Sequence, residues 1–194
     1  MSPLLHFAAW CVGLARVRPV LLPDEAVCLG RLAAGRRRIA EIGVWHGGST
    51  RLMRDAMAAD GVLVAVDPFV PGRLGFSPQR VIARREVARG ANGRVIWIRE
   101  RADEAARDVR VRDGGFDLVF LDAQHTYDGL RDEWTAWSPL VAPNGLVAIH
   151  DSRAHPKGKI DDLGSVRFTT EVILQDPRFV LAESVDSLTV VRRR

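Results

Sequence analysis

Cysteine, lysine and long apolar runs are all scarce in this sequence of 194 residues. The two cysteines, Cys11 and Cys28, have no metal or redox spacing, which favours a reducing compartment and predicts a cytoplasmic protein. The apolar run at residues 4–15 is too short to span a bilayer and contains His6. It also has no basic segment before it and no cleavage site typical of a secretory signal. We therefore predict an amphipathic N-terminal helix and no membrane association.

Only two of the 28 basic residues are lysines, Lys157 and Lys159. The arginines are scattered along the chain and interleaved with acids, and the net charge is +4. This distribution favours a solvated arginine surface over a groove for nucleic acid. A weak attraction for anionic substrates stays open.

Internal repeats, low-complexity tracts and shifts in composition are also absent, so we expect a single domain over residues 1–194, with a helical segment at 1–35 and a sheet with its helices at 36–194. Apolar, β-branched runs alternate with helical patterns. The candidate strands are residues 37–43, 62–67, 94–98, 116–122, 145–151, 178–183 and 187–192. The candidate helices are residues 23–35, 48–59, 78–89, 101–109, 128–141 and 165–176.

The first five candidate strands show little polar alternation, as expected of parallel strands that are buried on both faces. Their alternation with helices predicts right-handed βαβ units in an open α/β sheet. The last two strands are separated by a short turn without a helix, which predicts an antiparallel hairpin at one edge.

The first strand ends in a glycine-rich loop, GVWHGGST at residues 43–50, followed by a helix. The spacing differs from G-x-G-x-x-G, so the dinucleotide fingerprint is absent. Glycines here let backbone N–H groups and a helix N-terminus face an anion. Such turns are also common in α/β proteins without any ligand, and this loop alone leaves both interpretations open.

Polar residues follow the other strands, where ligands of parallel sheets bind. Asp67, 24 residues after Gly43, can accept hydrogen bonds from both hydroxyls of a ribose, or can simply end a strand. Together with the glycine loop it indicates a nucleoside-bearing ligand. Ala102 and Asp103 follow the third strand, where they either border the base or begin a helix in which acids are favoured.

The fourth and fifth strands end at Asp122 and Asp151, and His125 follows three residues after Asp122. Two carboxylates on adjacent strand ends can share a divalent cation. A histidine there suits a general base near neutral pH.

Two stretches carry a resemblance to class I S-adenosylmethionine-dependent methyltransferases, which spans about residues 23–192. AEIGVWHGGST at residues 40–50 resembles motif I of the catechol and caffeoyl-CoA type of O-methyltransferase. The stretch FLDAQH through AIHD at residues 120–151 is similar to a wider group that includes bacterial sugar and natural-product methyltransferases. The resemblance implies a Rossmann-like, doubly wound, mostly parallel seven-stranded sheet of order 3-2-1-4-5-7-6 with an antiparallel last strand.

The resemblance also implies S-adenosylmethionine as cofactor, with Ser49 bonding its methionine carboxylate, Asp67 its ribose, and Ala102 and Asp103 bordering adenine. The full implied set of cofactor-binding residues is Glu41, Gly43, Trp45, Gly47, Ser49, Asp67, Ala102, Asp103 and Asp122. His125 falls on the position of the catalytic lysine in the catechol enzymes, and Asp122 is the second implied catalytic residue.

Metal-dependent members of the group bind Mg²⁺, for which Asp122 and Asp151 are the implied ligands. The third ligand is typically asparagine, but this chain has Ser152, a poorer ligand. If no metal binds, His125 takes the proton alone.

The expected function is methyl transfer to a hydroxyl of a small metabolite such as a sugar, phenol or natural product. The run [DNS]-P-P-[YF] of many base N-methyltransferases is absent, which disfavours nucleic-acid acceptors. The alternatives are a catalytically degenerate cofactor-binding module and a different nucleotide-binding enzyme on the same sheet. A homo-oligomer stays open, and residues 67–78 and 151–166 are expected to border the acceptor.

Overall fold

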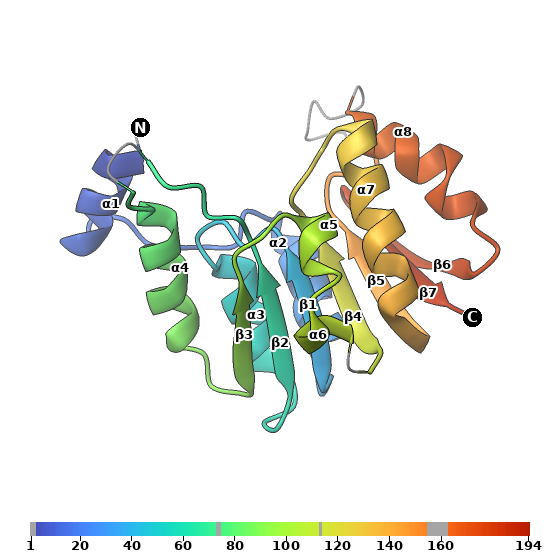
Figure 1. Ribbon diagram of the computed structural model, residues 1–194, viewed down its shortest axis with the longest axis horizontal. Helices are drawn as coiled ribbons and strands as arrows, with labels where there is room; N and C mark the ends of the chain where they lie inside the picture. Colours follow the sequence, from blue (N-terminus) through green and yellow to red (C-terminus); the bar gives the residue numbers. More distant parts are fainter. Residues whose placement is uncertain (1–2, 73–74, 113, 155–162) are drawn as a thin grey trace.

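A computed structural model of the protein describes residues 3–72, 75–112, 114–154 and 163–194. It contains a seven-stranded sheet of order β3-β2-β1-β4-β5-β7-β6, which confirms the predicted order (Figure 1). The strands are β1 (Arg38–Ile42), β2 (Val62–Val66), β3 (Arg94–Ile98), β4 (Phe116–Leu121), β5 (Val141–Ile149), β6 (Phe179–Val185) and β7 (Leu188–Arg193).

Helices cover both faces of this sheet. They are α1 (Pro3–Cys11), α2 (Pro23–Ala33), α3 (Gly48–Ala56), α4 (Pro78–Ala88), α5 (Ala102–Ala105), α6 (Val109–Arg112), α7 (Tyr127–Trp137) and α8 (Gly164–Glu171). The single helix predicted at residues 101–109 is two short helices, because Asp108 accepts a hydrogen bond from the Arg110 N–H at 2.8 Å and begins a new turn. Strand β5 begins at Val141, four residues before the predicted start.

Pairing between β1 and β2, β1 and β4, β2 and β3, and β4 and β5 is parallel. Strand β7 is antiparallel to both of its neighbours, β5 and β6. The predicted hairpin is therefore correct, and β7 is the antiparallel strand inserted before β6. In an open parallel sheet, the carboxyl ends of β1, β4 and β5 meet at one edge, where ligands bind.

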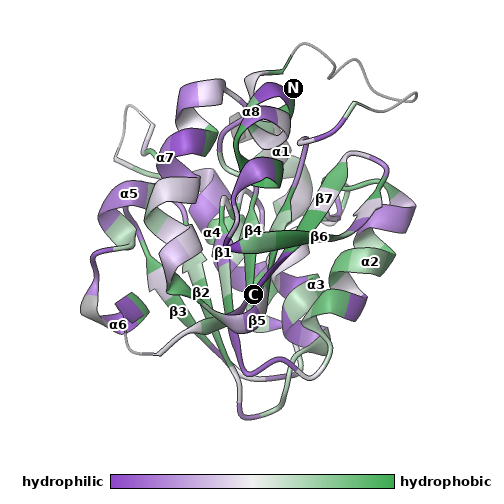
Figure 2. Cartoon of the chain, turned by 90° about the vertical axis from the view of Figure 1, so that its right-hand side faces the viewer, coloured by the Kyte–Doolittle hydropathy of each residue, from purple (hydrophilic) through white to green (hydrophobic). Residues whose placement is uncertain are grey.

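The core consists of two hydrophobic layers, one on each face of the sheet. Ala40 and Ile42 of β1 pack toward α5, α6 and α7, whereas Ile39 packs toward α2 and α3. This period of two is that of a strand buried on both faces. Figure 2 shows mostly hydrophobic strands enclosed by helices that carry both hydrophilic and hydrophobic residues.

The N-terminal segment reaches the carboxyl edge of the sheet. Helix α1 packs against α4, and the following segment crosses the first turn of α3. A Cβ added to Gly48 would lie 2.5 Å from the backbone of Arg18 and Pro19, so glycine permits this crossing. Within the described ranges, the chain has no helix with the length and apolarity needed to cross a membrane.

Candidate active site

A cavity of about 260 Å³ lies at the carboxyl ends of β1, β4 and β5. The polar residues in its wall come from separate segments: Arg18, His46, Ser49, Asp122, His125, His150 and Asp151. Trp45, which is 54% exposed, lies at the same cavity. The structure therefore brings together five residues that the sequence singled out, and it adds Arg18, His46 and His150.

Glycine is required where the loop after β1 approaches β4. Gly43 has a φ of +94°, and a Cβ there would lie 2.5 Å from the carbonyl oxygen of Asp122. Gly47 has a φ of +81° and precedes the first turn of α3. Side chains rarely adopt these angles, so the loop can turn this sharply only with glycine. Its close approach places the start of α3 beside Asp122.

Asp67 holds the same loop from the end of β2. Its Oδ2 accepts hydrogen bonds from the N–H groups of Val44 at 3.1 Å and Trp45 at 3.0 Å. Its Oδ1 accepts one from the Phe69 N–H at 2.7 Å. A carboxylate can accept about four hydrogen bonds, so acceptor capacity remains for a ligand.

Glu41 lies beneath the first turn of α3 and is fully buried. The Ser49 hydroxyl donates a hydrogen bond to Glu41 Oε1 at 2.5 Å. Burial raises the pKa of Glu41 to about 8, and the charges of Asp122 and Asp67 act in the same direction. This raised pKa favours the protonated form of Glu41, which supports the floor of the site, whereas Ser49 reaches the cavity itself.

His150 at the end of β5 joins the buried carboxylate of Glu25 to the half-buried carboxylate of Asp122, and the sequence interpretation missed it. Its side chain is 10% exposed, its Nδ1 lies 2.8 Å from Asp122 Oδ1 and its Nε2 lies 3.3 Å from Glu25 Oε2. Burial alone would lower the pKa of His150, but the bonds to Asp122 and Glu25 outweigh it and raise the pKa to about 10. The ring is therefore an imidazolium at neutral pH.

Glu25, in the first turn of α2, is fully buried and was also missed. Its carboxylate accepts hydrogen bonds from the Leu22 N–H at 2.9 Å, the Ser187 N–H at 2.8 Å and the Ser187 hydroxyl at 2.6 Å. Burial alone would raise the pKa of Glu25, but the bonds from His150 and Ser187 lower it to about 2. Glu25, His150 and Asp122 thus form a chain of charged groups, the charged triad, from α2 through β5 to β4.

His125 is half-buried in the cavity wall just before α7. Its Nδ1 lies 3.8 Å from Asp151 Oδ2. Ser165 in α8 holds both residues, because its N–H donates to the His125 carbonyl at 3.1 Å and its hydroxyl donates to the Asp151 carbonyl at 2.6 Å. Asp151 also has a left-handed backbone, with a φ of +46°. The arrangement holds a histidine beside a carboxylate and facing the cavity.

The expected Mg²⁺ ligands do not fit a metal site. Asp122 Oδ1 and Asp151 Oδ1 lie 2.8 and 3.8 Å from His150 nitrogens, so a cationic side chain already adjoins both carboxylates. The Ser152 hydroxyl turns inward, where it donates to the Ile149 carbonyl at 2.7 Å and accepts from the Thr189 N–H at 3.1 Å. Across the described residues, no group of three or more histidine, cysteine or acidic side chains is arranged to hold a metal ion.

Ala102 and Asp103 begin α5 at the end of β3, outside the cavity wall. The Trp137 indole donates to the Ala102 carbonyl at 2.9 Å, and Asp103 lies 3.4 Å from Arg101. Of the two loops expected to border the acceptor, residues 155–162 and 73–74 lie outside the described residues.

The fold and the site together define a class of protein. A sheet of order 3-2-1-4-5-7-6, a glycine turn after β1 and an acid after β2 are the arrangement of a class I S-adenosylmethionine-dependent methyltransferase. The sequence matches the family described as "Methyltransferase domain" over residues 40–152. The chain belongs to this family, and the resemblance seen in the sequence is confirmed.

Solved structures share the fold. The O-methyltransferase TomG from Streptomyces achromogenes, solved with SAM, is 20% identical, with a TM-score of 0.66 over 100% of this chain and 90% of that chain. An O-methyltransferase from Bacillus cereus, solved with SAH, is 19% identical, with a TM-score of 0.65 over 99% and 89%. The N-methyltransferase NodS from Bradyrhizobium japonicum WM9 is 15% identical, with a TM-score of 0.57 over 88% and 94%. No curated protein gives a significant match to the sequence.

Proposed function

We propose that this protein transfers the methyl group of S-adenosylmethionine to a hydroxyl of a small metabolite, with His125 as the general base. One observation carries the proposal: His125 shares a cavity with the first turn of α3, where the methionine end of the cofactor would bind. The likeness to structures solved with SAM and SAH supports this cofactor. Because O- and N-methyltransferases share the fold, the choice of a hydroxyl rests on His125.

We assign residues of the cavity wall and of the neighbouring strand ends to the parts of the cofactor. The hydroxyl of Ser49 is engaged by Glu41, so the backbone N–H groups at the start of α3 are the donors for the methionine carboxylate, with Arg18 in the wall of the same cavity. Asp67 retains acceptor capacity for the ribose hydroxyls. Ala102 and Asp103 border the adenine, and Trp45 covers the methionine half.

When bound, the cofactor supplies an electrophilic methyl group on a sulfonium. His125 would remove the proton from the acceptor hydroxyl, and the bound cofactor would supply the methyl group to that oxygen, with its sulfur as the leaving atom. Since Nδ1 of His125 faces Asp151, its Nε2 is the nitrogen left for the acceptor. Asp151 then stabilises the imidazolium that forms. Most of the rate acceleration comes from holding oxygen, carbon and sulfur in line.

The Asp67→Ala variant tests the cofactor assignment. Removing the carboxylate takes away the ribose acceptor and releases the loop at Val44 and Trp45, so we expect S-adenosylmethionine to bind about 10- to 100-fold more weakly in calorimetry. Asp117→Ala is the matched control, because Asp117 Oδ2 also accepts two backbone N–H groups, from Arg37 and Arg38, at the opposite end of the sheet. If Asp67→Ala and Asp117→Ala lost equal affinity for S-adenosylmethionine, the result would contradict a direct contact between Asp67 and the cofactor.

Metal removal tests the assignment of the carboxylates. Because His150 adjoins both Asp122 and Asp151, we expect turnover after EDTA treatment to stay within about twofold of the untreated value. The measurement is a methyl-acceptor screen of hydroxylated metabolites with EDTA and with added Mg²⁺. A recovery of turnover of about tenfold or more on adding Mg²⁺ would contradict this expectation. Such a recovery corresponds to roughly 1.4 kcal/mol in the activation free energy.

A further inference from the structure

The positive charge of the chain is concentrated at one end of the sheet. Residues 76–112 contain ten arginines and five acidic residues, a net charge of +5, whereas the whole chain carries +4. The other residues together therefore carry −1. Within this stretch, the fold brings arginines of α4, β3 and α6 to one cavity.

Two neighbouring cavities run along this end, with volumes of about 910 and 310 Å³, and Arg84 lines both. The larger one follows β3 between Arg84 of α4 and Arg110 and Arg112 of α6, and Arg94 also lines it. We refer to these four residues and the space between them as the arginine groove. The lining of either cavity contains no acidic side chain among the described residues.

Most charges of the arginine groove are not neutralised within the described part of the chain. Arg110 pairs with Asp108 at 2.6 Å. No carboxylate of the described residues pairs with Arg84, Arg94 or Arg112, and the Arg84 guanidinium instead lies over the Trp97 ring, 5.2 Å from its centroid. Like charges gathered without counter-ions repel one another, and an anionic partner relieves that repulsion.

Strand β3 also offers hydrogen-bonding groups, because it is the last strand on its side of the sheet. The Arg94 N–H donates to the Gly61 carbonyl at 2.9 Å, and the Ile98 carbonyl accepts from the Asp67 N–H at 3.2 Å, so both residues face β2. Backbone direction alternates along a strand. The N–H and carbonyl groups of Val95 and Trp97 consequently face the open edge.

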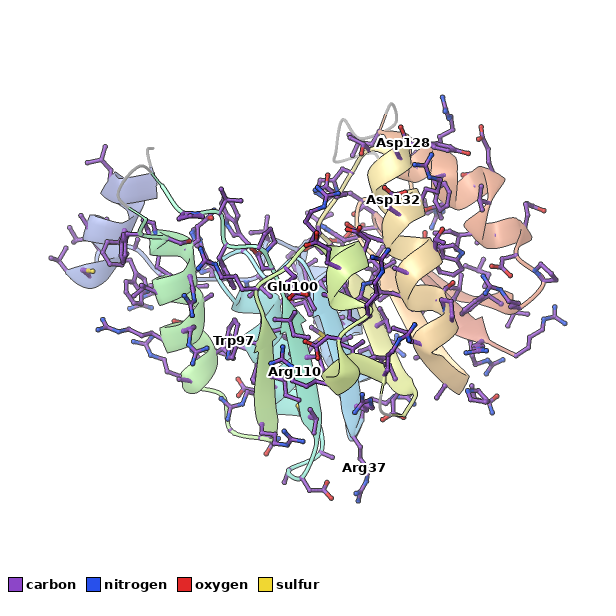
Figure 3. The ribbon with its side chains drawn as sticks, in the orientation of Figure 1. Arg37, Trp97, Glu100, Arg110, Asp128 and Asp132 are labelled. Atoms are coloured by element: carbon purple, nitrogen blue, oxygen red, sulfur yellow. The ribbon has the colours of Figure 1, made fainter. Side chains whose placement is uncertain are left out.

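Arginines flank this edge on both faces of the sheet. Trp97 packs in the layer of α2 and α3, on the side of Arg84, whereas Ile96 packs in the layer that contains Val111 of α6. Figure 3 shows Trp97 and Arg110 on either side of β3. A strand added to this edge would direct successive side chains to opposite faces, and each face presents guanidinium groups.

We propose that the open edge of β3 binds an acidic polypeptide segment as an added strand of about five residues. Backbone bonds to Val95 and Trp97 provide affinity, and carboxylates at successive positions pair with the arginine groove. A single-stranded nucleic acid fits less well, because the Trp97 ring that would stack a base is covered by Arg84. This partner site is separate from the methyl-transfer site and does not depend on the proposed acceptor.

Fluorescence anisotropy tests the proposal. The probe is a fluorescein-labelled peptide of nine residues, composed of glutamate, valine and threonine, with glutamates at successive positions. We expect binding that the double reversal Arg84→Glu/Arg112→Glu weakens about tenfold or more. Arg192→Glu, at an exposed arginine of β7, is the control and should change affinity less than about twofold. The same peptide N-methylated at its central five residues keeps its charge but cannot form the ladder, and should lose binding.

Hydrogen exchange on the unmodified protein adds a readout that does not depend on variant folding. The peptide should slow exchange of the Val95 and Trp97 amides and leave the β7 amides unchanged. Equal binding of the N-methylated peptide, unchanged exchange at β3, or tighter binding of an oligo-dT strand of equal charge would overturn the proposal. So would absence of peptide binding at millimolar concentration, which would leave the arginines the role of keeping an edge strand unpaired.

Discussion

We expect His125→Gln to lower the turnover number by about 10²- to 10⁴-fold and to leave the affinity for S-adenosylmethionine nearly unchanged. The His125 imidazole lies in the cavity wall and adjoins a carboxylate, Asp151 at 3.8 Å, that can pair with the imidazolium formed in the reaction. Glutamine keeps the length and polarity of the side chain but cannot accept the proton at this rate. Steady-state kinetics with a hydroxylated acceptor and calorimetry with the cofactor measure the two effects separately.

His46→Gln is the matched control for this prediction. His46 lines the same cavity from the loop after β1, where its ring centroid lies 4.8 Å from that of Trp45. We expect its variant to keep turnover within a few fold, because it lies on the cofactor loop and not at the β4 end. A loss of turnover in His46→Gln without a loss in His125→Gln would identify His46 as the general base instead. Cofactor binding without turnover on any acceptor in the unmodified protein would favour the catalytically degenerate module.

Sequence patterns predicted the fold well because they are local. Buried β-branched runs and capped helices follow from neighbouring residues, and the parallel sheet follows from their alternation. The exception at residues 101–109 is also local, since the Asp108 side chain competes for the Arg110 N–H and divides a pattern that reads as one helix. Strand β5 began earlier than predicted because Val141 pairs with Phe116 across the sheet, and a single sequence does not reveal that register.

The candidate site was also predictable only where its residues follow from local patterns. Asp122, His125 and Asp151 could be predicted to lie together, because each follows a parallel strand and those strand ends meet. Glu25 could not, since acids are common in the first turn of any helix and its partner His150 is 125 residues away. Without that partnership, the carboxylates at the strand ends suggested a metal site. The structure shows that the His150 imidazolium supplies the positive charge beside the carboxylates of Asp122 and Asp151.

Glu25→Ala should destabilise the protein by about 3–5 kcal/mol, because it leaves the buried imidazolium of His150 without one of its carboxylates and removes the acceptor of two Ser187 donors. For a domain of this size, the melting temperature should fall by about 10 °C or more. Urea unfolding at pH 6 measures the change. Asp24→Ala, at the exposed neighbour in the same turn of α2, is the control and should cost under about 1 kcal/mol.

The pH dependence of the difference in unfolding free energy distinguishes the charges of the Glu25–His150–Asp122 triad from simple packing. The pKa of Glu25 lies at about 2 in the folded protein against an ordinary value of 4.5, so its contribution is present above pH 4.5 and is lost as the pH falls toward 2. The pKa of His150 lies at about 10 against an ordinary 6.5, so its contribution is fully present below pH 6.5 and is lost as the pH rises through 10. The stability gap between the unmodified protein and Glu25→Ala should therefore be widest between pH 4.5 and 6.5 and narrow on both sides. A gap that stays constant from pH 3 to 10, roughly the full span of both titrations, would mean that Glu25 acts through its volume alone.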